Sequence, residues 1–330
     1  MLLEQFYSNN KAKQTLVNWI TDGRLPHTVL LEGEDGCGKM TFARMTAAAV
    51  LCQQEQSGQR PCGECRNCRL ILSDSHPDVI IAQSEDKANS FHVEEIRQIR
   101  SDAYVRPNDG DYKVYILRNI HNMTEQAQNA LLKIIEEPPK QVIFILTCNN
   151  RARVLPTILS RAALVQLSVC TKEECSKALE HLCGKSVTEE RRQQAAELSE
   201  GNIGKALKML QDENTLKLVC DARRIAEMVC VGQEFDLLAA LQEYTGVKKR
   251  GEFVQLLDAM KDYFLDFIRM KNGIGEPCGN ISTPVKNRLT ALQAMRILAI
   301  IDTTTAQVVQ NVSPAMAAAA FCAGTRSILQ

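Results

Sequence analysis

The sequence predicts an α/β domain followed by an all-α region, and two observations support this fold class. In the first half of the chain, short β-branched and aliphatic runs alternate with stretches whose apolar residues recur at helical spacing. After about residue 168 the strand-like runs fade and helical patterns take over. Strands that alternate with helices predict a parallel sheet with helices on its faces.

The predicted elements of the first half can be taken in order. The predicted buried strands are short runs rich in β-branched and aliphatic residues at 28–32, 78–82, 113–117, 141–147 and 163–167. The helices between them are predicted at 40–52, 93–104 and 125–136. Thr124 is placed to cap the last helix, and Pro138 with Pro139 ends it.

The second half is predicted to be helical throughout. Apolar residues at helical spacing predict helices at 173–182, 189–198, 205–210 and 252–271, with a final helical pair over 285–328. A break rich in Gly, Pro and Asn covers residues 273–284. The pattern therefore predicts one α/β domain, a small helical lid and a larger C-terminal helical domain.

Composition excludes several classes of protein. The 330 residues carry 39 Lys+Arg against 39 Asp+Glu, so a broad basic face for stand-alone nucleic-acid binding is not expected. No apolar run reaches the roughly 20 residues that span a bilayer, and the N-terminus lacks the features of a signal peptide. We therefore expect a cytoplasmic protein, in which most of the 13 cysteines behave as small buried hydrophobes.

Residues 33–40, Gly-Glu-Asp-Gly-Cys-Gly-Lys-Met, follow a predicted strand and open a predicted helix. Except at the last position they fit the phosphate-binding pattern G-x-x-x-x-G-K-[ST], whose glycines let backbone N–H groups converge on a phosphate. Gly33, Gly36, Gly38 and Lys39 are therefore candidate nucleotide-binding residues. The alternative is a tight turn that keeps its glycines for backbone reasons, and the sequence leaves open whether ATP or ADP still binds.

Two parts of a hydrolytic site are missing. Met40 stands where a hydroxyl would bind Mg²⁺, and Thr41 cannot simply replace it because one helical step turns a side chain by about 100°. An ATPase of this class also needs acidic residues after a second strand. The strand at 113–117 is followed instead by Arg118 and Asn119. We therefore expect this chain to have no catalytic activity of its own.

Four cysteines form a second motif, with nine residues after the first and two between each later pair. They are Cys52, Cys62, Cys65 and Cys68, and the last three lie in a loop rich in Pro, Gly, Arg and Asn. This spacing predicts a tetrahedral four-thiolate Zn²⁺ site, whose closed shell makes its role structural. The alternative is a set of free thiols, which would be prone to oxidation without a metal.

Arg161 lies in the segment Ser160-Arg161-Ala162, beyond the predicted fourth strand. An arginine at such a helix end can cap carbonyl groups or form a surface ion pair. It can also act as a finger that reaches the nucleotide of a neighbouring subunit, a role suited to a planar and always charged guanidinium. These residues alone do not choose between the two roles.

The order of these motifs resembles the bacterial clamp-loader AAA+ family. The resemblance is dense over 1–168, moderate to about 210 and weak beyond. It is carried by Arg24–Gly33, the glycine loop, the four cysteines, His76–Val79, Lys113–Leu117, Asn129–Pro139 and Leu155–Arg161. The run Asn-Ala-Leu-Leu-Lys that ends in Glu-Glu-Pro-Pro is specific to clamp loaders.

This resemblance implies three domains. They are an AAA+ parallel-sheet P-loop domain at 1–168 with a zinc module at 52–68, a small helical lid at 169–210, and a helical collar for oligomerisation at 211–330. The family's ATP-hydrolysing members, tau and gamma, carry Thr after the loop lysine, Asp-Glu after the second strand and Arg in the lid. Here those positions hold Met40, Arg118-Asn119 and Gly204.

The Ser-Arg-Cys motif of the family survives as Ser160-Arg161-Ala162, which keeps the arginine. The resemblance therefore implies a stator-like subunit with a degenerate ATP site, in which Arg161 acts in trans. Its implied partners are the tau/gamma and delta subunits and, through the complex, the sliding clamp and primer–template DNA. Arg97, Arg100 and Arg106 lie near a plausible DNA-facing helix, where we expect solvated surface charge.

Two other functions stay open at this point. One is an active P-loop enzyme, either a motor subunit of a clamp loader or a nucleotide kinase with a zinc module, and residues 40, 118 and 119 argue against it. The other is a zinc-dependent DNA-binding protein that acts alone. The zero net charge and the lack of a basic–aromatic stripe argue against that function.

Overall fold

The computed structural model describes residues 2–54, 56–82, 91, 93–211, 213–231, 234–246, 249–273 and 281–329. The chain divides into two compact units. The first comprises Met1–Ser186 with Gly201–Lys205, and the second comprises Val187–Glu200 with Ala206–Gln330. The domain boundaries at 168 and 210 stay a prediction.

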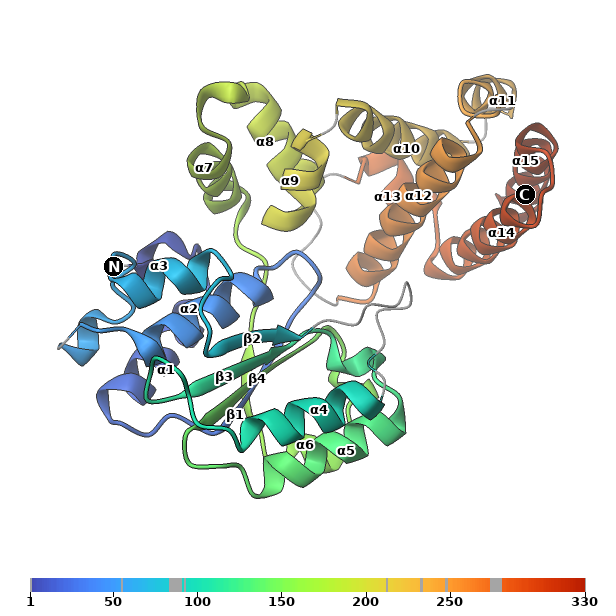
Figure 1. Cartoon of the computed structure of the whole chain (residues 1–330). Helices are drawn as coiled ribbons and strands as arrows, with labels where there is room; N and C mark the ends of the chain where they lie inside the picture. Colours follow the sequence, from blue (N-terminus) through green and yellow to red (C-terminus); the bar gives the residue numbers. More distant parts are fainter. Residues whose placement is uncertain are drawn as a thin grey trace. The chain divides into compact units, whose positions relative to one another are not determined.

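A five-stranded parallel sheet forms the centre of the first unit, as the sequence predicts (Figure 1). Its strands lie in the order β2-β3-β4-β1-β5. They are β1 (Thr28–Glu32), β2 (Val79–Ala82), β3 (Lys113–Leu117), β4 (Val142–Cys148) and β5 (Ala163–Gln166). The strand that precedes the glycine loop therefore lies inside the sheet, between β4 and β5.

Helices cover both faces of the sheet because successive strand side chains point to opposite sides. Val29 and Leu31 pack with α1 (Asn10–Thr21), α2 (Lys39–Leu51) and α3 (Arg66–Leu72). Leu30 packs with α4 (Val93–Ala103), α5 (Glu125–Glu136) and α6 (Pro156–Leu159) on the opposite face. The helix α7 (Lys172–Cys183) completes the unit.

The second unit is built from helices around one core. Phe253, Phe264, Phe267 and Phe321 are fully buried there. Its helices are α8 (Glu189–Leu198), most of α9 (Ile203–Gln211), α10 (Glu213–Val231), α11 (Glu234–Gln242), α12 (Arg250–Lys271), α13 (Thr283–Arg288), α14 (Ala291–Val309) and α15 (Pro314–Leu329).

The end of the chain departs from the prediction, because the stretch 285–328 forms three helices instead of two. The backbone of Leu289 is extended, and Thr290 starts α14 with a capping box. Most of the predicted break at 273–284 lies outside the described residues.

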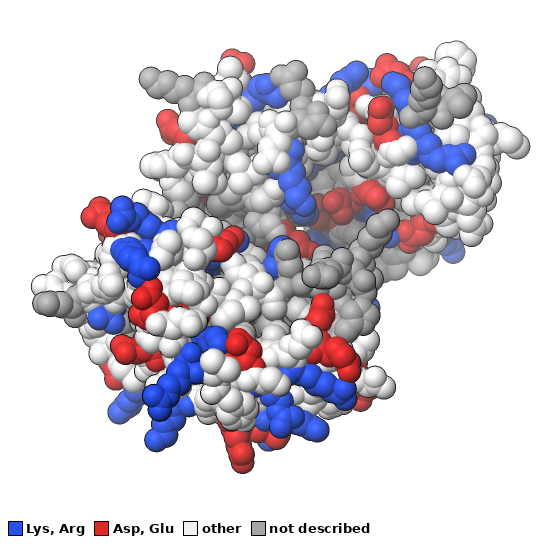
Figure 2. Space-filling view, viewed as in Figure 1, with Lys and Arg blue, Asp and Glu red and all other residues white. Residues whose placement is uncertain are grey.

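Basic and acidic side chains are interspersed over the surface that Figure 2 shows. This mixture agrees with the balanced charge of the sequence. No helix in the described part of the chain combines the length and apolar character needed to cross a membrane.

Candidate functional site

The glycine loop follows β1 and turns directly into α2, as its motif predicts. Gly36 and Gly38 have φ values of 90° and 93°, a left-handed backbone that other residues rarely adopt. A Cβ atom at Gly38 would lie 2.9 Å from the ring of Phe6. The two glycines are therefore needed to bring the loop to the N-terminus of α2.

Lys39 is buried beneath this loop, with only 7% of its side chain exposed. Its ammonium donates to the carbonyl oxygens of Gly33 at 2.7 Å and Glu34 at 2.8 Å. It also contacts Asp35 Oδ1 at 3.2 Å. Partial burial acts to raise the pKa of Asp35, but the charge and hydrogen bond of Lys39, with a hydrogen bond from Asn149, lower it overall.

The sheet is parallel, so the carboxyl ends of β1, β4 and β3 lie along one edge, with β4 between β1 and β3. Arg118 and Asn119 follow β3, so a cation and an amide stand where a hydrolytic site needs carboxylates. Asn149 follows β4 and donates from Nδ2 to Asp35 Oδ2 at 3.3 Å. His121 is buried, and its burial lowers the pKa of its imidazole, so the ring is neutral at pH 7.

The start of α9 and the residue before it contact the loop through one side chain and one backbone N–H. Asn202 is buried and donates from Nδ2 to the carbonyl of Asp35 at 2.8 Å. The N–H of Gly204 donates to the carbonyl of Gly36 at 3.0 Å. A Cβ atom at Gly204 would lie 2.5 Å from the Cα of Gly36, so this arrangement leaves no room for a side chain at position 204.

The four predicted cysteines come together, and their sulfur atoms all lie within 4.8 Å of one another. Zn–S bonds of about 2.3 Å in a tetrahedron place two sulfurs about 3.8 Å apart. The sulfurs of Cys62 and Cys68 are 3.9 Å apart, which fits this geometry. The donor set and its spacing therefore match a structural zinc site.

Backbone N–H groups support these sulfurs as acceptors. Cys62 accepts from the N–H of Cys65, and Cys65 accepts from the N–H of Cys68, both at 3.4 Å. Burial acts to raise the pKa of Cys62, but N–H groups of Cys65 and Glu64 outweigh it and lower the pKa to about 7. The thiolate form that a metal requires is therefore favoured at Cys62.

Arg161 follows α6 and is half-exposed. Its Nη1 donates to the carbonyl of Thr157 at 3.1 Å and to Ser160 Oγ at 3.2 Å. Its Nη2 lies 3.1 Å from Glu136 Oε1, at the end of α5. Three neighbouring acceptors therefore hold this guanidinium, which remains accessible to solvent.

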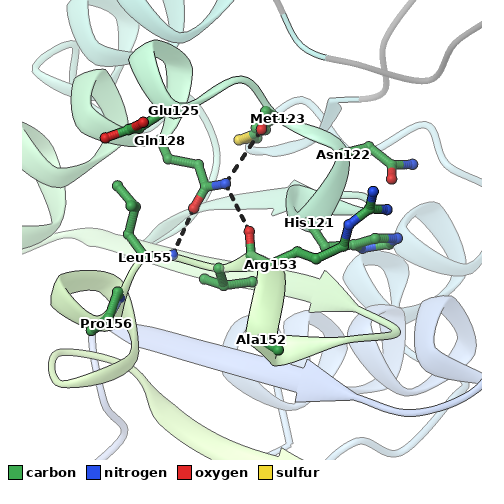
Figure 3. Close-up of a pocket in the computed structure, with 10 residues that line it drawn as sticks. His121, Asn122, Met123, Glu125, Gln128, Ala152, Arg153, Leu155 and Pro156 are labelled. Carbon is green, nitrogen blue, oxygen red and sulfur yellow. Dashed lines mark hydrogen bonds between the residues drawn. The ribbon is translucent and has the colours of Figure 1, made fainter.

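A pocket of about 620 Å³ lies between the start of α5 and the segment that leads into α6 (Figure 3). His121 and Arg153 line it. The buried amide of Gln128 donates to the carbonyls of Met123 and Arg153 and accepts from the N–H of Leu155 (Figure 3). Gln128 thereby fixes α5 to the segment before α6.

Comparison with known proteins gives the family. Residues 8–171 match the family model described as DNA polymerase III, delta subunit. The DNA polymerase III subunit delta' of Yersinia pestis is 30% identical over 295 residues, which cover 88% of this chain and 84% of that protein. The chain belongs to the delta' family of DNA polymerase III.

Other relatives match a shorter part of this delta' family chain. The subunit tau/gamma of Haemophilus influenzae is 34% identical over 51% of this chain and 24% of its own length. The tau subunit of Escherichia coli is 33% identical over 59% of this chain and 30% of its own length. A gamma subunit-related protein of Thermotoga maritima has a TM-score of 0.46 at 16% identity, covering 98% of this chain and 100% of that chain.

The structure brings some of the predicted site residues of this delta' family member together and separates others. Lys39 and its glycines share one edge of the sheet with Arg118 and Asn119, and Gly204 contacts the same loop. Arg161 belongs to a different constellation, with Glu136. Sequence reasoning missed Asn149, two residues beyond the predicted strand at 141–147, and Asn202, which lies between the predicted helices at 189–198 and 205–210.

Proposed function

We propose that this chain is the stator-like subunit of a DNA polymerase III clamp loader and helps to load the sliding clamp onto primed DNA. One observation carries the proposal most directly. A well-formed glycine loop with a buried Lys39 shares one edge of the sheet with the end of β3, which is followed by Arg118 and Asn119 instead of carboxylates. The chain therefore keeps the framework of an ATPase site without the groups that activate water.

The contacts of the loop support a degenerate ATP site. Met40 packs against the hydrophobic core beside α2 and offers no oxygen ligand for Mg²⁺. The ammonium of Lys39 already contacts Asp35, a negative group that competes with a phosphate. Position 204, which holds an arginine in the ATP-hydrolysing members, holds a glycine here, and its backbone packs so closely on the loop that no side chain would fit. ATP or ADP binding to this loop is therefore not part of the proposed function.

The trans role of Arg161 supports the same function. Its guanidinium is half-exposed at the end of a short helix, so it is available to a nucleotide on a neighbouring subunit. A planar, permanently charged group stabilises the charge that develops on phosphoryl oxygens. We therefore assign this residue to a tau/gamma site that the chain itself does not contain.

The proposed partners are the tau/gamma and delta subunits, and DNA and the sliding clamp are reached through the complex. The C-terminal helices offer a surface for assembly as a collar, because α14 and α15 carry exposed apolar side chains. Leu292, Met295, Val309 and Met316 are each at least half-exposed. Leu292 and Met295 lie at the start of α14, whereas Val309 ends α14 and Met316 lies in the first turn of α15. Exposed apolar side chains at such helix ends offer contacts that a partner can cover.

Zinc is the proposed structural cofactor of the first unit. Cys52, Cys62, Cys65 and Cys68 would hold it, and the bound ion would cross-link the end of α2 to the loop before α3 and to α3 itself. The residues of this chain supply four sulfur donors and the N–H groups that orient them.

Reconstitution tests the function directly. The chain is combined with tau/gamma and delta, and clamp loading onto primed DNA is measured with and without it. We expect loading to require the chain, although the isolated, zinc-replete protein shows no steady ATP turnover. Turnover by the isolated protein that disappears in Lys39→Ala would instead identify an active P-loop enzyme.

A further inference from the structure

The Glu-Glu-Pro-Pro motif ends α5 and has no role in the function proposed so far. The helix stops at Glu136, and Glu137 has left the helical conformation with φ −130° and ψ 67°. Proline cannot continue a helix, so Pro138 and Pro139 fix where α5 ends. The motif therefore sets Glu136 as the last helical residue.

A carboxylate at this position conflicts with helix electrostatics. The C-terminal end of a helix carries partial negative charge, which makes an acidic residue in the last turn unfavourable. Glu136 is compensated by Arg161, whose Nη2 lies 3.1 Å from its Oε1. Glu136 is unfavourable for the helix end, and one specific cation, Arg161, balances it. Such a compensated departure from a local preference indicates a functional reason for the pair.

The guanidinium of Arg161 is oriented by three acceptors. Thr157 and Ser160 accept from Nη1, and Glu136 accepts from Nη2. An arginine has five N–H donors, so these contacts leave donors for an incoming phosphate. A long side chain loses substantial rotamer freedom when it is ordered, and ordering it in advance lowers the cost of binding later.

The elements that supply these acceptors are tied to each other. Leu131, Ile134 and Ile135 anchor α5 in the core beneath the sheet. At the other end of α5, the amide of Gln128 bonds to the backbone on either side of Val154, just before α6 (Figure 3). The position of Glu136 relative to the last turn of α6 is therefore fixed.

We propose that Glu136 is a positioning residue for Arg161, which holds the guanidinium in the orientation that meets the nucleotide of the neighbouring subunit. The proposal rests on the trans role of Arg161 given above. Glu136 acts only through the arginine, so its removal should change turnover only while the arginine is present.

A double-mutant cycle in the reconstituted complex tests this role. Clamp- and DNA-stimulated ATPase is measured against ATP concentration for Glu136→Gln, Arg161→Ala and the double variant. An exposed pair of this kind corresponds to about a two- to five-fold fall in kcat, with little change in KM. The double variant should match Arg161→Ala alone. Glu137→Gln, one residue further on, is the matched control and should behave as wild type.

The outcomes separate this proposal from the function on which it rests. If Arg161→Ala lowers turnover but Glu136→Gln does not, the positioning role is wrong and the finger stands. A Glu136→Gln effect that persists in the double variant, or a rise in turnover, also overturns the positioning role. If the Arg161→Ala complex works at the wild-type rate, the finger itself is wrong.

A second variant guards against an indirect effect on folding. Glu136→Asp keeps the charge but shortens the side chain by one methylene, so the carboxylate no longer reaches Arg161 in the same geometry. We expect it to lower kcat as Glu136→Gln does, with an unchanged thermal midpoint of unfolding. Wild-type turnover in Glu136→Asp would show that charge near α6, and not the position of the guanidinium, is what matters.

Discussion

The glycine loop and the Arg161 constellation, formed by Arg161 with Glu136, Thr157 and Ser160, belong to the same unit. They differ in which features of an ATPase site they keep. The loop keeps its left-handed glycines and a buried Lys39, yet the groups around it are wrong for hydrolysis. The Arg161 constellation keeps a charged, accessible guanidinium held by three acceptors. The glycine loop has the backbone of a phosphate-binding site but lacks the groups for hydrolysis. Arg161 supplies a group suited to phosphoryl transfer but has no nucleotide site beside it in the described part of this unit.

This difference indicates which constraint acts on each region. A phosphate loop also connects β1 to α2, so its glycines are needed for folding even when no nucleotide binds. The guanidinium of Arg161 has no comparable structural necessity, because a surface ion pair contributes little to stability. The presence of this guanidinium therefore agrees with the proposed action on another subunit.

The largest effect is expected from Arg161→Ala in the reconstituted complex. Trans arginines contribute about 10³–10⁵ in rate at the site they serve. Turnover at the tau/gamma site next to this subunit should fall by that order, while assembly stays nearly unchanged. Arg161→Lys should be nearly as poor, because an ammonium lacks the forked geometry. Single-turnover ATP hydrolysis by the complex measures the loss.

Two further variants sharpen this comparison. Arg151→Ala removes another exposed arginine of the same unit, which pairs with Glu32 at 3.6 Å, and should leave turnover unchanged. Lys39→Ala should also leave the turnover of the complex unchanged, because in the proposed function the chain's own loop does not hydrolyse ATP. A fall in turnover with Lys39→Ala and none with Arg161→Ala would reverse the comparison.

The sequence predicted the sheet well because the three central strands, β3, β4 and β1, are almost fully buried and consist mostly of apolar residues. It missed α1, although Ala12, Leu16, Trp19 and Ile20 recur at helical spacing and pack against the core of the first unit. It also missed α3, whose seven residues lie within the cysteine motif. A helix of seven residues is too short for amphipathic periodicity to reveal it.

The parts of the site that depend on the folded chain could not be predicted in the same way. Motif spacing identified the glycine loop and the cysteines because these residues lie close together in the sequence. Asn202 and Asp35 are 167 positions apart, and no local pattern announces their hydrogen bond. The pairing of Glu136 with Arg161 likewise requires knowing that α5 and α6 share one face of the sheet.

Removal of zinc should disturb the loop side of the unit and spare the Arg161 side. Cys52 directly follows α2, which begins at Lys39, and Cys65 caps α3. Cys65→Ser should reduce bound metal from close to one equivalent and unfold the segment 52–72 locally. Metal analysis and amide hydrogen exchange would measure both changes. Four freely titratable thiols in folded, metal-free protein would contradict the assignment.

A smaller effect is expected where the lid segment meets the loop. In Gly204→Ala the added Cβ would overlap the Cα of Gly36, and such overpacking costs about 1–3 kcal/mol. Hydrogen exchange of β1 and β4 amides would measure the loss in stability of the first unit. Gly251→Ala is the control, because nothing lies within 4 Å of its Cβ position. Equal behaviour of the two variants would mean that the Gly204 contact does not restrain the loop.

The smallest expected effect is a pH dependence of stability that arises on the side of the glycine loop and not from Arg161. Burial lowers the pKa of His76 and His121, on the loop side, while the guanidinium of Arg161 does not titrate. Because the folded pKa lies below the unfolded value of about 6.5, the unfolded chain takes up more protons as pH falls. This contribution to stability is therefore fully present well above pH 6.5 and is lost as the pH falls through 6.5 toward the lowered pKa values of the folded state.

Asparagine substitutions test the source of this decline. The Nδ1 atom of His76 accepts from the N–H of Asp78 at 3.1 Å, and that of His121 accepts from the N–H of Asn149 at 3.5 Å. An asparagine oxygen can accept the same hydrogen bonds without titrating. The double variant His76→Asn/His121→Asn should therefore flatten the decline in unfolding free energy between pH 7.5 and 5.5, a change smaller than that of Gly204→Ala. The carboxylates of Asp35 and Asp78 have lowered pKa values and titrate only at lower pH, so they do not mask the test. A slope that persists in the double variant would place the titrating groups elsewhere.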